Sequence, residues 1–356
     1  MKMKSIQEMS LREKVGQMFL ILPDSLEGKS ELAQLSGQEQ NGTSEVTREL
    51  REVYDRYPCG GFTLLAKNIT GKEQLIRFTR DLHSLGTVRP MIAIDEEGGR
   101  VARIGNHPVN FHVPQIPHMS DIAETGDPEK AYEVGQTIGR YLKAYGMDID
   151  FAPVADVNTN PENPVIGRRT FGDDPDLAAK MVVRCYEGLK SEGIEGCLKH
   201  FPGHGDTKTD SHKGYAETTK TWEKIQACEM IPFMAGIRAK CGMIMTAHIT
   251  VPAVTGTLPS TVSPEMLTGK LRGELGYTGL IITDALNMGA ITSQYDSAEA
   301  AIRCILAGVD IALMPYDYMA AFDGVMDAVH QGRIPEQRIN ESVARILSYK
   351  EQLQRI

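Results

Sequence analysis

Eight short apolar runs recur along the 356 residues, on average about 42 residues apart. Each run is nearly continuous and several are flanked by glycine, a pattern typical of parallel strands that are buried on both faces of a sheet. The runs are Gln17–Leu22, Gly61–Ala66, Met91–Asp95, Met147–Pro153, Gly196–His200, Gly242–His248, Gly279–Asp284 and Val309–Met314.

The segments between the runs predict helices that connect successive parallel strands. Leu177–Ser191 and Ala298–Leu306 are amphipathic and long enough for such crossovers. Eight βα units predict an α/β fold of the (β/α)8 TIM-barrel type. A doubly wound sheet is disfavoured because no G-x-G-x-x-G turn follows the first run. We expect one domain over residues 1–356, with a polar surface insertion at about 24–44 and a C-terminal helix at about 336–354.

Charge and composition exclude several classes of protein. The chain has 38 Lys and Arg against 47 Asp and Glu, a formal charge of -9, which argues against nucleic acid or an anionic membrane as the partner. No apolar run approaches the ~20 residues of a membrane span, and no signal peptide is visible, so we expect a cytoplasmic protein. The six cysteines include no C-x-x-C pair and predict free, mostly buried thiols. The oligomeric state stays open.

Polar residues follow most of the apolar runs, among them Asp95, Lys199 and Asp284. In a (β/α)8 barrel the carboxyl ends of the strands meet on one face, where barrel enzymes have their active sites. A single polar residue at such a place could simply end a strand at the protein surface. The repetition along the chain instead favours a polar pocket.

The stretch Lys199–Gly214 is the densest in polar side chains. His200, His204 and His212 are possible zinc ligands, although the Pro-Gly pair between the first two would break a helix. Lys199 could alternatively form a Schiff base, as in aldolases. That chemistry requires a desolvated, neutral amine, whereas nearby carboxylates favour the charged form.

Asp210 and His212 are two positions apart, so in an extended segment their side chains point the same way. A carboxylate beside an imidazole orients the ring and raises its pKa, which suits proton transfer near neutral pH. A solvated loop histidine is the plainer interpretation. The glycine-rich loop beside a polar pocket nevertheless favours a lid that delivers a proton donor.

Asp284 ends a strand that has no other charge. A carboxylate buried there needs hydrogen bonds or positive partners, for which Lys199, Arg103, Arg168 and Arg169 are candidates. It is then either a partner in a structural ion pair, or a nucleophile or stabiliser of a cationic transition state.

Four ordered stretches carry longer motifs. They are Asp95–Arg103 (D-x-E-G-G-R-V-x-R), Phe151–Val157 (F-A-P-V-x-D-V), Ile166–Gly172 (I-G-x-R-[ST]-F-G) and Lys199–His212 (K-H-F-P-G-H-G-x4-D-x-H). Together they resemble glycoside hydrolase family 3, specifically its single-domain β-N-acetylglucosaminidase (β-N-acetylhexosaminidase) branch. The turn Thr283–Leu286 resembles that of the family's nucleophile.

The resemblance implies that Asp284 is the nucleophile and that His212, oriented by Asp210, is the acid/base. It further implies that the sugar is held by Asp95, Arg103, Arg169, Lys199 and His200. No metal or organic cofactor is implied. A histidine acid/base departs from the usual pair of carboxylates, and a neutral imidazole avoids repulsion with a nearby carboxylate. It would also tolerate an anionic acceptor, so a phosphorylase using the same residues is an alternative.

The implied activity is that of a retaining exo-β-N-acetylglucosaminidase, which releases terminal non-reducing β-N-acetylglucosamine from a carbohydrate through a covalent glycosyl-enzyme intermediate. Cell-wall (muropeptide) recycling and chitooligosaccharide degradation are both candidate roles. A metal-dependent barrel hydrolase and a non-catalytic sugar-binding barrel are the remaining alternatives. Because the sugar-holding set includes two arginines, a lysine and a histidine, we expect a locally basic pocket despite the acidic average.

Overall fold

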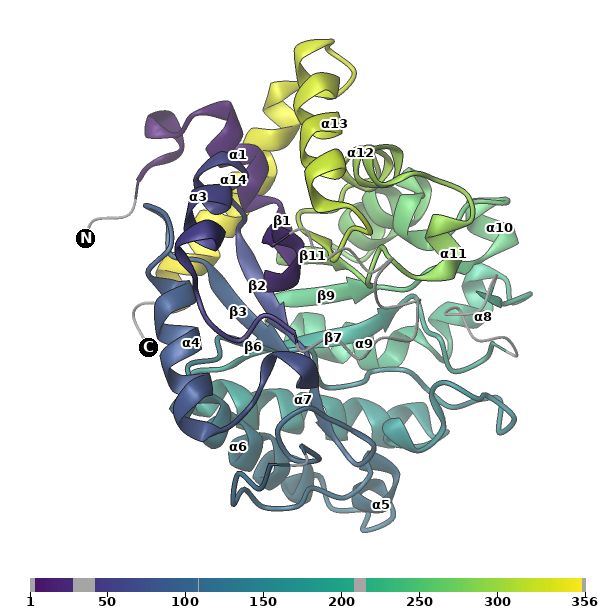
Figure 1. Cartoon of the computed structure of the whole chain (residues 1–356). Helices are drawn as coiled ribbons and strands as arrows, with labels where there is room; N and C mark the ends of the chain where they lie inside the picture. The colour runs from purple at the N-terminus through teal and green to yellow at the C-terminus, as the bar shows by residue number, and fades with distance from the viewer. Residues whose placement is uncertain (1–3, 28–41, 108, 208–215, 354–356) are drawn as a thin grey trace.

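Eight parallel strands form the centre of the structure, and helices surround them (Figure 1). This computed structural model describes residues 4–27, 42–107, 109–207 and 216–353. Each barrel strand overlaps one of the eight apolar runs. In chain order the strands are β1 (Phe19–Ile21), β2 (Gly61–Leu64), β3 (Met91–Ile94), β6 (Ile149–Asp150), β7 (Glu195–Phe201), β9 (Met243–Thr246), β11 (Leu280–Thr283) and β12 (Ala312–Leu313).

The strand order around the sheet is β11-β9-β7-β6-β3-β2-β1-β12, and every neighbouring pair is parallel. A parallel bridge between Ile282 and Ile311 joins the two ends of this order. The Leu313 amide also donates to Thr283 Oγ1 at 2.9 Å. These contacts close the sheet into the predicted (β/α)8 barrel.

Helices follow the strands in the alternation that the sequence predicts. They are α1 (Leu11–Gln17), α3 (Arg48–Arg56), α4 (Lys72–His83), α5 (Met119–Ala123), α6 (Pro128–Ala144), α7 (Pro175–Ser191), α8 (Trp222–Gln226), α9 (Met230–Arg238), α10 (Pro252–Thr255), α11 (Gly289–Thr292), α12 (Ser297–Ala307), α13 (Tyr318–His330) and α14 (Glu336–Leu353). Short 3-10 turns lie at Ile6–Glu8, Pro23–Leu26, Ala66–Asn68, Gly167–Arg169 and Ser260–Val262, and a π-helix at Glu265–Glu274.

Local sequence explains where the crossover helices begin and end. An aspartate caps α7, because Asp174 accepts from the amides of Asp176 and Leu177, and Pro175 occupies the first turn. Helix α12 starts in the same way at Asp296 and ends at Gly308, whose φ of 118° favours glycine. The predicted C-terminal helix is α14, which lies beside α1 (Figure 1).

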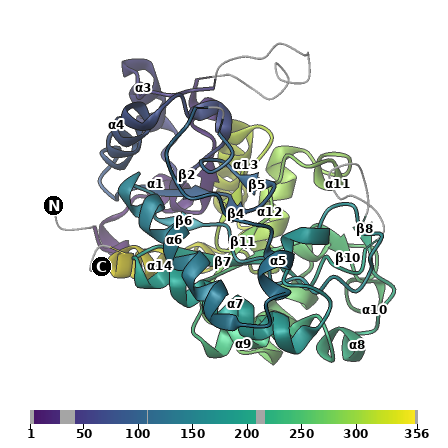
Figure 2. The same ribbon diagram turned by 90° about the horizontal axis from the view of Figure 1, so that it is seen from below.

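Four short strands lie in loops beyond the carboxyl ends of the barrel strands. β4 (Glu96–Gly98) and β5 (Val101–Ala102) form an antiparallel hairpin directly after β3. β8 (Ala216–Glu217) and β10 (Ile249–Thr250) pair in parallel, near α10 in Figure 2. These additions build up the face on which the strands end.

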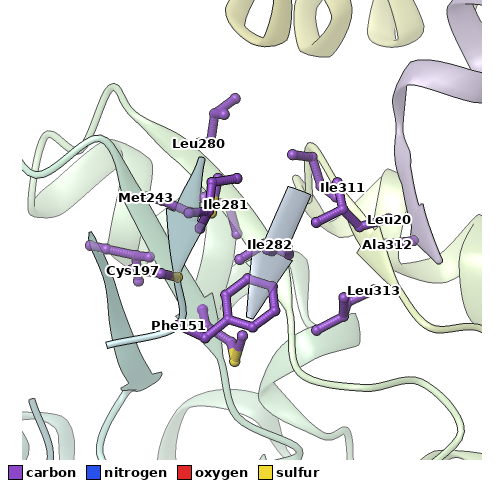
Figure 3. Close-up of a cluster of buried hydrophobic side chains, with 14 of the residues drawn as sticks. Leu20, Phe151, Cys197, Met243, Leu280, Ile281, Ile282, Ile311, Ala312 and Leu313 are labelled. Carbon is purple, nitrogen blue, oxygen red and sulfur yellow. The ribbon is translucent and has the colours of Figure 1, made fainter. Parts of the chain in front are cut away.

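Apolar side chains fill the barrel interior and the layer between strands and helices. Figure 3 shows Phe151, which follows β6, in one buried cluster with Ile282 of β11 and Leu313 of β12. Five of the six cysteines are buried, Cys228 is half-buried, and all are free, as predicted. In the described ranges, no helix is both long and apolar enough to cross a membrane.

The ends of the predicted insertion at 24–44 are anchored rather than freely exposed. Asp24 is 3% exposed and accepts a hydrogen bond from Asn68 Nδ2 at 2.7 Å. The Thr43 amide donates to the same carboxylate at 3.3 Å. Positions 28–41 of the insertion lie outside the described residues.

Candidate active site

A pocket of about 370 Å³ opens at the carboxyl end of the barrel. Its lining comes from the strands β2, β7, β9 and β12 and from segments that follow β2, β3, β6, β7, β11 and β12. Seven residues that the sequence analysis selected line this one pocket, namely Asp95, Arg103, Arg169, Lys199, His200, His204 and Asp284. The expected convergence of polar strand ends is therefore confirmed for Asp95, Lys199, His200 and Asp284.

Lys199 is the centre of the charge network in the pocket. It lies on β7, is 2% exposed, and its Nζ contacts Asp95 Oδ1 at 2.9 Å and Glu97 Oε1 at 2.7 Å. Burial lowers the pKa of Lys199, but the two carboxylates outweigh it and hold the pKa above its ordinary value. The amine is therefore kept charged, which argues against the Schiff-base alternative.

Two arginines complete this network. Arg103 Nη2 lies 3.1 Å from Asp95 Oδ2. Arg169 binds Glu97 in a two-point contact, with distances of 2.7 and 2.8 Å. The described residues of the lining thus include three cations and three carboxylates. The cations are Arg103, Arg169 and Lys199, and the carboxylates are Asp95, Glu97 and Asp284. The prediction of a basic pocket is wrong, because each cation that the sequence suggested has an acidic neighbour.

The pKa values of the two network carboxylates follow from these contacts. Burial raises the pKa of Asp95, but Lys199 and Arg103 hold it well below its usual range. Burial likewise works against ionisation of Glu97, and Arg169 with Lys199 lowers its pKa. Both groups are thus stable anions that can accept hydrogen bonds from hydroxyl groups.

Asp284 follows β11 directly and is fixed by its backbone. The amide of Asp284 donates to Thr246 O at 3.0 Å, and the next amide, of Ala285, donates to Asp284 Oδ1 at 2.7 Å. Burial raises the pKa of this carboxyl, but His200 and His248 outweigh it and lower the pKa. Asp284 is therefore an ionised carboxylate at the edge of the pocket.

The positive partners of Asp284 differ from those predicted. Lys199 contributes to its low pKa, after His200 and His248. Arg103 and Arg169 instead pair with Asp95 and Glu97, and Arg168 reaches outward to Asp121 at 2.5 Å. The arginines thus neutralise Asp95 and Glu97, and His200 and His248 are the groups that lower the pKa of Asp284 most.

Asp156 contacts two of the histidines, one through its ring and one through its backbone amide. His200 Nδ1 lies 2.7 Å from Asp156 Oδ2, and the amide of His204 donates to Oδ1 of the same carboxylate at 2.6 Å. Burial and the neighbouring His200 lower the pKa of His204, which favours its neutral form. The described residues contain no group of three or more His, Cys, Asp or Glu side chains arranged to hold a metal ion.

Asp210 and His212 lie outside the described residues, so their expected pairing stays a prediction. The residues on either side of this segment are described, and Asp206 before it contacts Thr218 and Lys220 after it. Thr218 Oγ1 donates to Asp206 Oδ2 at 2.6 Å, and Lys220 Nζ lies 3.1 Å from Asp206 Oδ1.

Comparison with known proteins agrees with this geometry. Residues 10–349 match the model of the glycosyl hydrolase family 3 N terminal domain. The chain belongs to glycosyl hydrolase family 3. It is 36% identical over 347 residues to beta-hexosaminidase A of Pseudoalteromonas piscicida, covering 89% of this chain and 57% of that protein.

Solved structures of this family have the same architecture. A family 3 beta-N-acetylglucosaminidase from Paenibacillus sp. str. FPU-7 has a TM-score of 0.88 at 34% identity, covering 97% of this chain and 63% of that one. LpqI of M. tuberculosis has a TM-score of 0.81 at 26% identity, covering 97% and 94%. The chain therefore spans less than two thirds of the Pseudoalteromonas and Paenibacillus proteins but nearly all of LpqI.

Three further residues of this family 3 site are Glu97, Asp156 and His248. The sequence places each of them at or after the end of an apolar run but assigns none of them a role. Side chains alternate along a strand, so β4 turns Glu97 away from the face of Glu96, but this short polar strand is not predicted from the sequence. Glu96 accepts from the amides of Ile104 and Gly105 and holds the hairpin instead. The contacts of Asp156 and His248 join segments that are distant in sequence, so the positions of these residues after apolar runs do not reveal their partners.

Proposed function

We propose that this chain is the catalytic barrel of a retaining exo-β-N-acetylglucosaminidase. The observation that carries the proposal is the arrangement of Asp284, an ionised carboxylate on one wall, across from the Lys199–Asp95–Glu97 network on the other. Relatives named beta-hexosaminidases and beta-N-acetylglucosaminidases support the choice of sugar.

In the proposed first step, Asp284 attacks the anomeric carbon while protonated His212, oriented by Asp210, donates its proton to the departing oxygen. The carbon–oxygen bond to the leaving group breaks as the bond to the carboxylate forms. In the second step, His212 takes a proton from water, which displaces Asp284 and releases the sugar with its original configuration.

The proposal also assigns roles to the residues that bind the sugar. Asp95, Arg103, Arg169, Lys199 and His200 hold the hydroxyl and amide groups of the terminal residue. Asp95 is an acceptor, while Lys199 and the arginines are donors. Because each cation is already paired with a carboxylate, the pocket presents fixed donors and acceptors without excess charge, which suits a neutral sugar.

The test is an assay of the purified chain on a nitrophenyl β-N-acetylglucosaminide, with the first-formed anomer followed by NMR. We expect β-N-acetylglucosamine as the initial product, the same product in phosphate buffer, and full activity after exhaustive chelation. The Asp284→Asn protein, purified identically, is the control for contaminating activity. An initial α-anomer would contradict retention, a sugar phosphate would indicate a phosphorylase, and loss of activity on chelation would indicate metal-dependent hydrolysis.

A further inference from the structure

A peptide group close to the proposed nucleophile is held on both of its sides. The Ala285 amide donates to Asp284 Oδ1 at 2.7 Å, and the next peptide group joins Ala285 to Leu286. The N–H of that second group donates to Leu313 O at 2.9 Å, and its carbonyl oxygen lies 2.9 Å from His248 Nε2. Leu313 and His248 therefore fix the turn that carries Asp284 from outside the turn itself.

The hydrogen-bond partners of His248 identify a ring nitrogen that carries a proton. A carbonyl oxygen can only accept, so Nε2 must donate to Ala285 O. The same oxygen accepts from the Met288 amide at 3.2 Å, within the turn. The other ring nitrogen, Nδ1, lies 2.8 Å from Thr261 Oγ1. The ring is therefore a donor to the turn whether it is neutral or charged.

A second set of contacts fixes the orientation of the His248 ring. Thr261, in the 3-10 turn Ser260–Val262, is fully buried, and its Oγ1 donates to Ala247 O at 2.9 Å. Thr246, at the end of β9, is also fully buried, and its Oγ1 lies 2.9 Å from Thr261 Oγ1. His248 is itself 2% exposed. Burial and a well-anchored hydroxyl thus hold the ring in one position.

His248 influences the pocket without belonging to its lining. It is not among the described residues that line the pocket, although Asp284 and Ala285 are. Burial raises the pKa of Asp284, and His200 and His248 lower it. A carboxylate that attacks carbon must be ionised and correctly oriented, and the contacts of His248 favour both conditions.

We propose that His248 is a positioning residue for the nucleophile, acting through its Nε2–H on the Ala285 carbonyl oxygen. The inference rests on the proposed function, in which Asp284 attacks the anomeric carbon. It adds to that reaction a residue outside the pocket lining. His248 therefore determines the rate of attack and leaves the affinity of the pocket for the sugar unchanged.

The experiment compares His248→Met with His248→Gln, whose side-chain amide keeps a donor near the place of Nε2. The rate of attack is measured with a slow fluorinated N-acetylglucosaminyl fluoride, because fluoride can leave without protonation. We expect the rate constant for labelling Asp284 to fall about a hundredfold in His248→Met and about threefold to tenfold in His248→Gln. The inhibition constant of N-acetylglucosamine should stay within about twofold of wild type in both.

His83→Met and His83→Gln are the matched controls. The half-buried His83 ring also contacts backbone carbonyl oxygens, namely Pro90 O and Gly146 O, both at 3.0 Å. Both oxygens precede barrel strands, β3 and β6, and so lie at the end of the barrel opposite Asp284. Neither substitution should change the labelling rate by more than about twofold.

Thr261→Val keeps the inference testable if circular dichroism shows that His248→Met does not fold. It removes the hydroxyl against Nδ1 and leaves the ring in place. We expect the labelling rate to fall by about threefold to tenfold, with an unchanged inhibition constant. A labelling rate equal to that of wild type would then overturn the inference.

Three results with folded variants would contradict the role of His248. One is labelling of His248→Met at the wild-type rate, and another is an equal loss in His248→Met and His83→Met. The third is an inhibition constant that rises in parallel with the loss of labelling, because His248 would then shape the pocket rather than position Asp284. If the wild-type chain is not labelled and turns over no substrate, the proposed function fails instead.

Discussion

Two lysines at opposite ends of the barrel are buried to the same extent but have different kinds of partner. Lys199 and Lys350 are each 2% exposed. Lys199, on β7, contacts two carboxylates in the pocket, whereas Lys350, on α14, donates to Gln17 Oε1 at 2.6 Å and Gly60 O at 2.7 Å. Both partners of Lys350 precede barrel strands, so this lysine lies at the amino ends of the strands.

The pKa values of the two lysines diverge accordingly. Carboxylates raise the pKa of Lys199 despite burial, while burial among neutral partners lowers the pKa of Lys350 to about 7. Near neutral pH the first is a fixed cation, whereas the second is close to its own pKa. Burial of an ionisable group therefore does not by itself mark a functional site, and the partners and the adjoining pocket decide the role.

Asp310, a buried carboxylate at the amino ends of the strands, shows the same difference between the two ends of the barrel. Asp310 is fully buried and accepts from Arg272, Arg345, Ser342 and the amide of Ile281 at 2.6–3.0 Å. Both carboxylate oxygens of Asp310 therefore accept hydrogen bonds from protein groups, two of them on α14. The carboxylates at the other end instead line an open pocket and remain available to a ligand.

The largest expected effect is a difference between two matched substitutions, Lys199→Met and Lys350→Met. Loss of Lys199 leaves Asp95 and Glu97 without their shared cation in the proposed sugar site, so kcat/KM should fall by about a thousandfold. Lys350→Met removes an equally buried lysine far from the pocket and should change kcat/KM by less than about threefold.

Steady-state kinetics, with circular dichroism to confirm that both variants fold, measures this difference. Similar activity losses in two folded variants would remove the distinction between the ends of the barrel.

A smaller effect is expected on stability and its pH dependence. The unfolded chain keeps the Lys350 proton up to its ordinary pKa of 10.5, while the folded chain releases it at about 7. Between these values the unfolded state binds more protons, so this contribution raises the free energy of unfolding as the pH rises, by at most about 1.4 kcal/mol per pH unit. The contribution is lost as the pH falls toward 7.

Urea unfolding of wild type and Lys350→Met at several pH values isolates this contribution as a difference. The wild type should gain stability relative to the variant from about pH 7 upward. A difference that does not change with pH would mean that Lys350 keeps an ordinary pKa in the fold.

The sequence predicts most of the fold because strands buried on both faces are nearly continuous apolar runs. All eight barrel strands overlap such runs, and α14 matches the predicted terminal helix. The β4–β5 hairpin was not predicted, since its residues are polar and charged. The sequence also does not predict that Asp24 is buried. This burial depends on hydrogen bonds from Asn68 and Thr43, which are distant in sequence.

The candidate site is predicted less completely than the fold. Motif positions identify Asp95, Lys199 and Asp284, and these line one pocket. The sequence does not predict the ion pairs of the site. Arg103 and Arg169, which were expected near Asp284, bind Asp95 and Glu97 on the opposite wall. Charge matching depends on distances between loops, and those distances follow from the closed barrel rather than from local sequence.

Covalent trapping tests the central claim, that Asp284 is the nucleophile of this pocket. The chain is incubated with a slow fluorinated N-acetylglucosaminyl fluoride, digested with a protease, and analysed by tandem mass spectrometry. We predict a single added sugar on the peptide that contains Asp284, attached to that carboxylate, and no added sugar in Asp284→Asn. A sugar attached to any other residue, such as Asp95 or His200, would contradict the account.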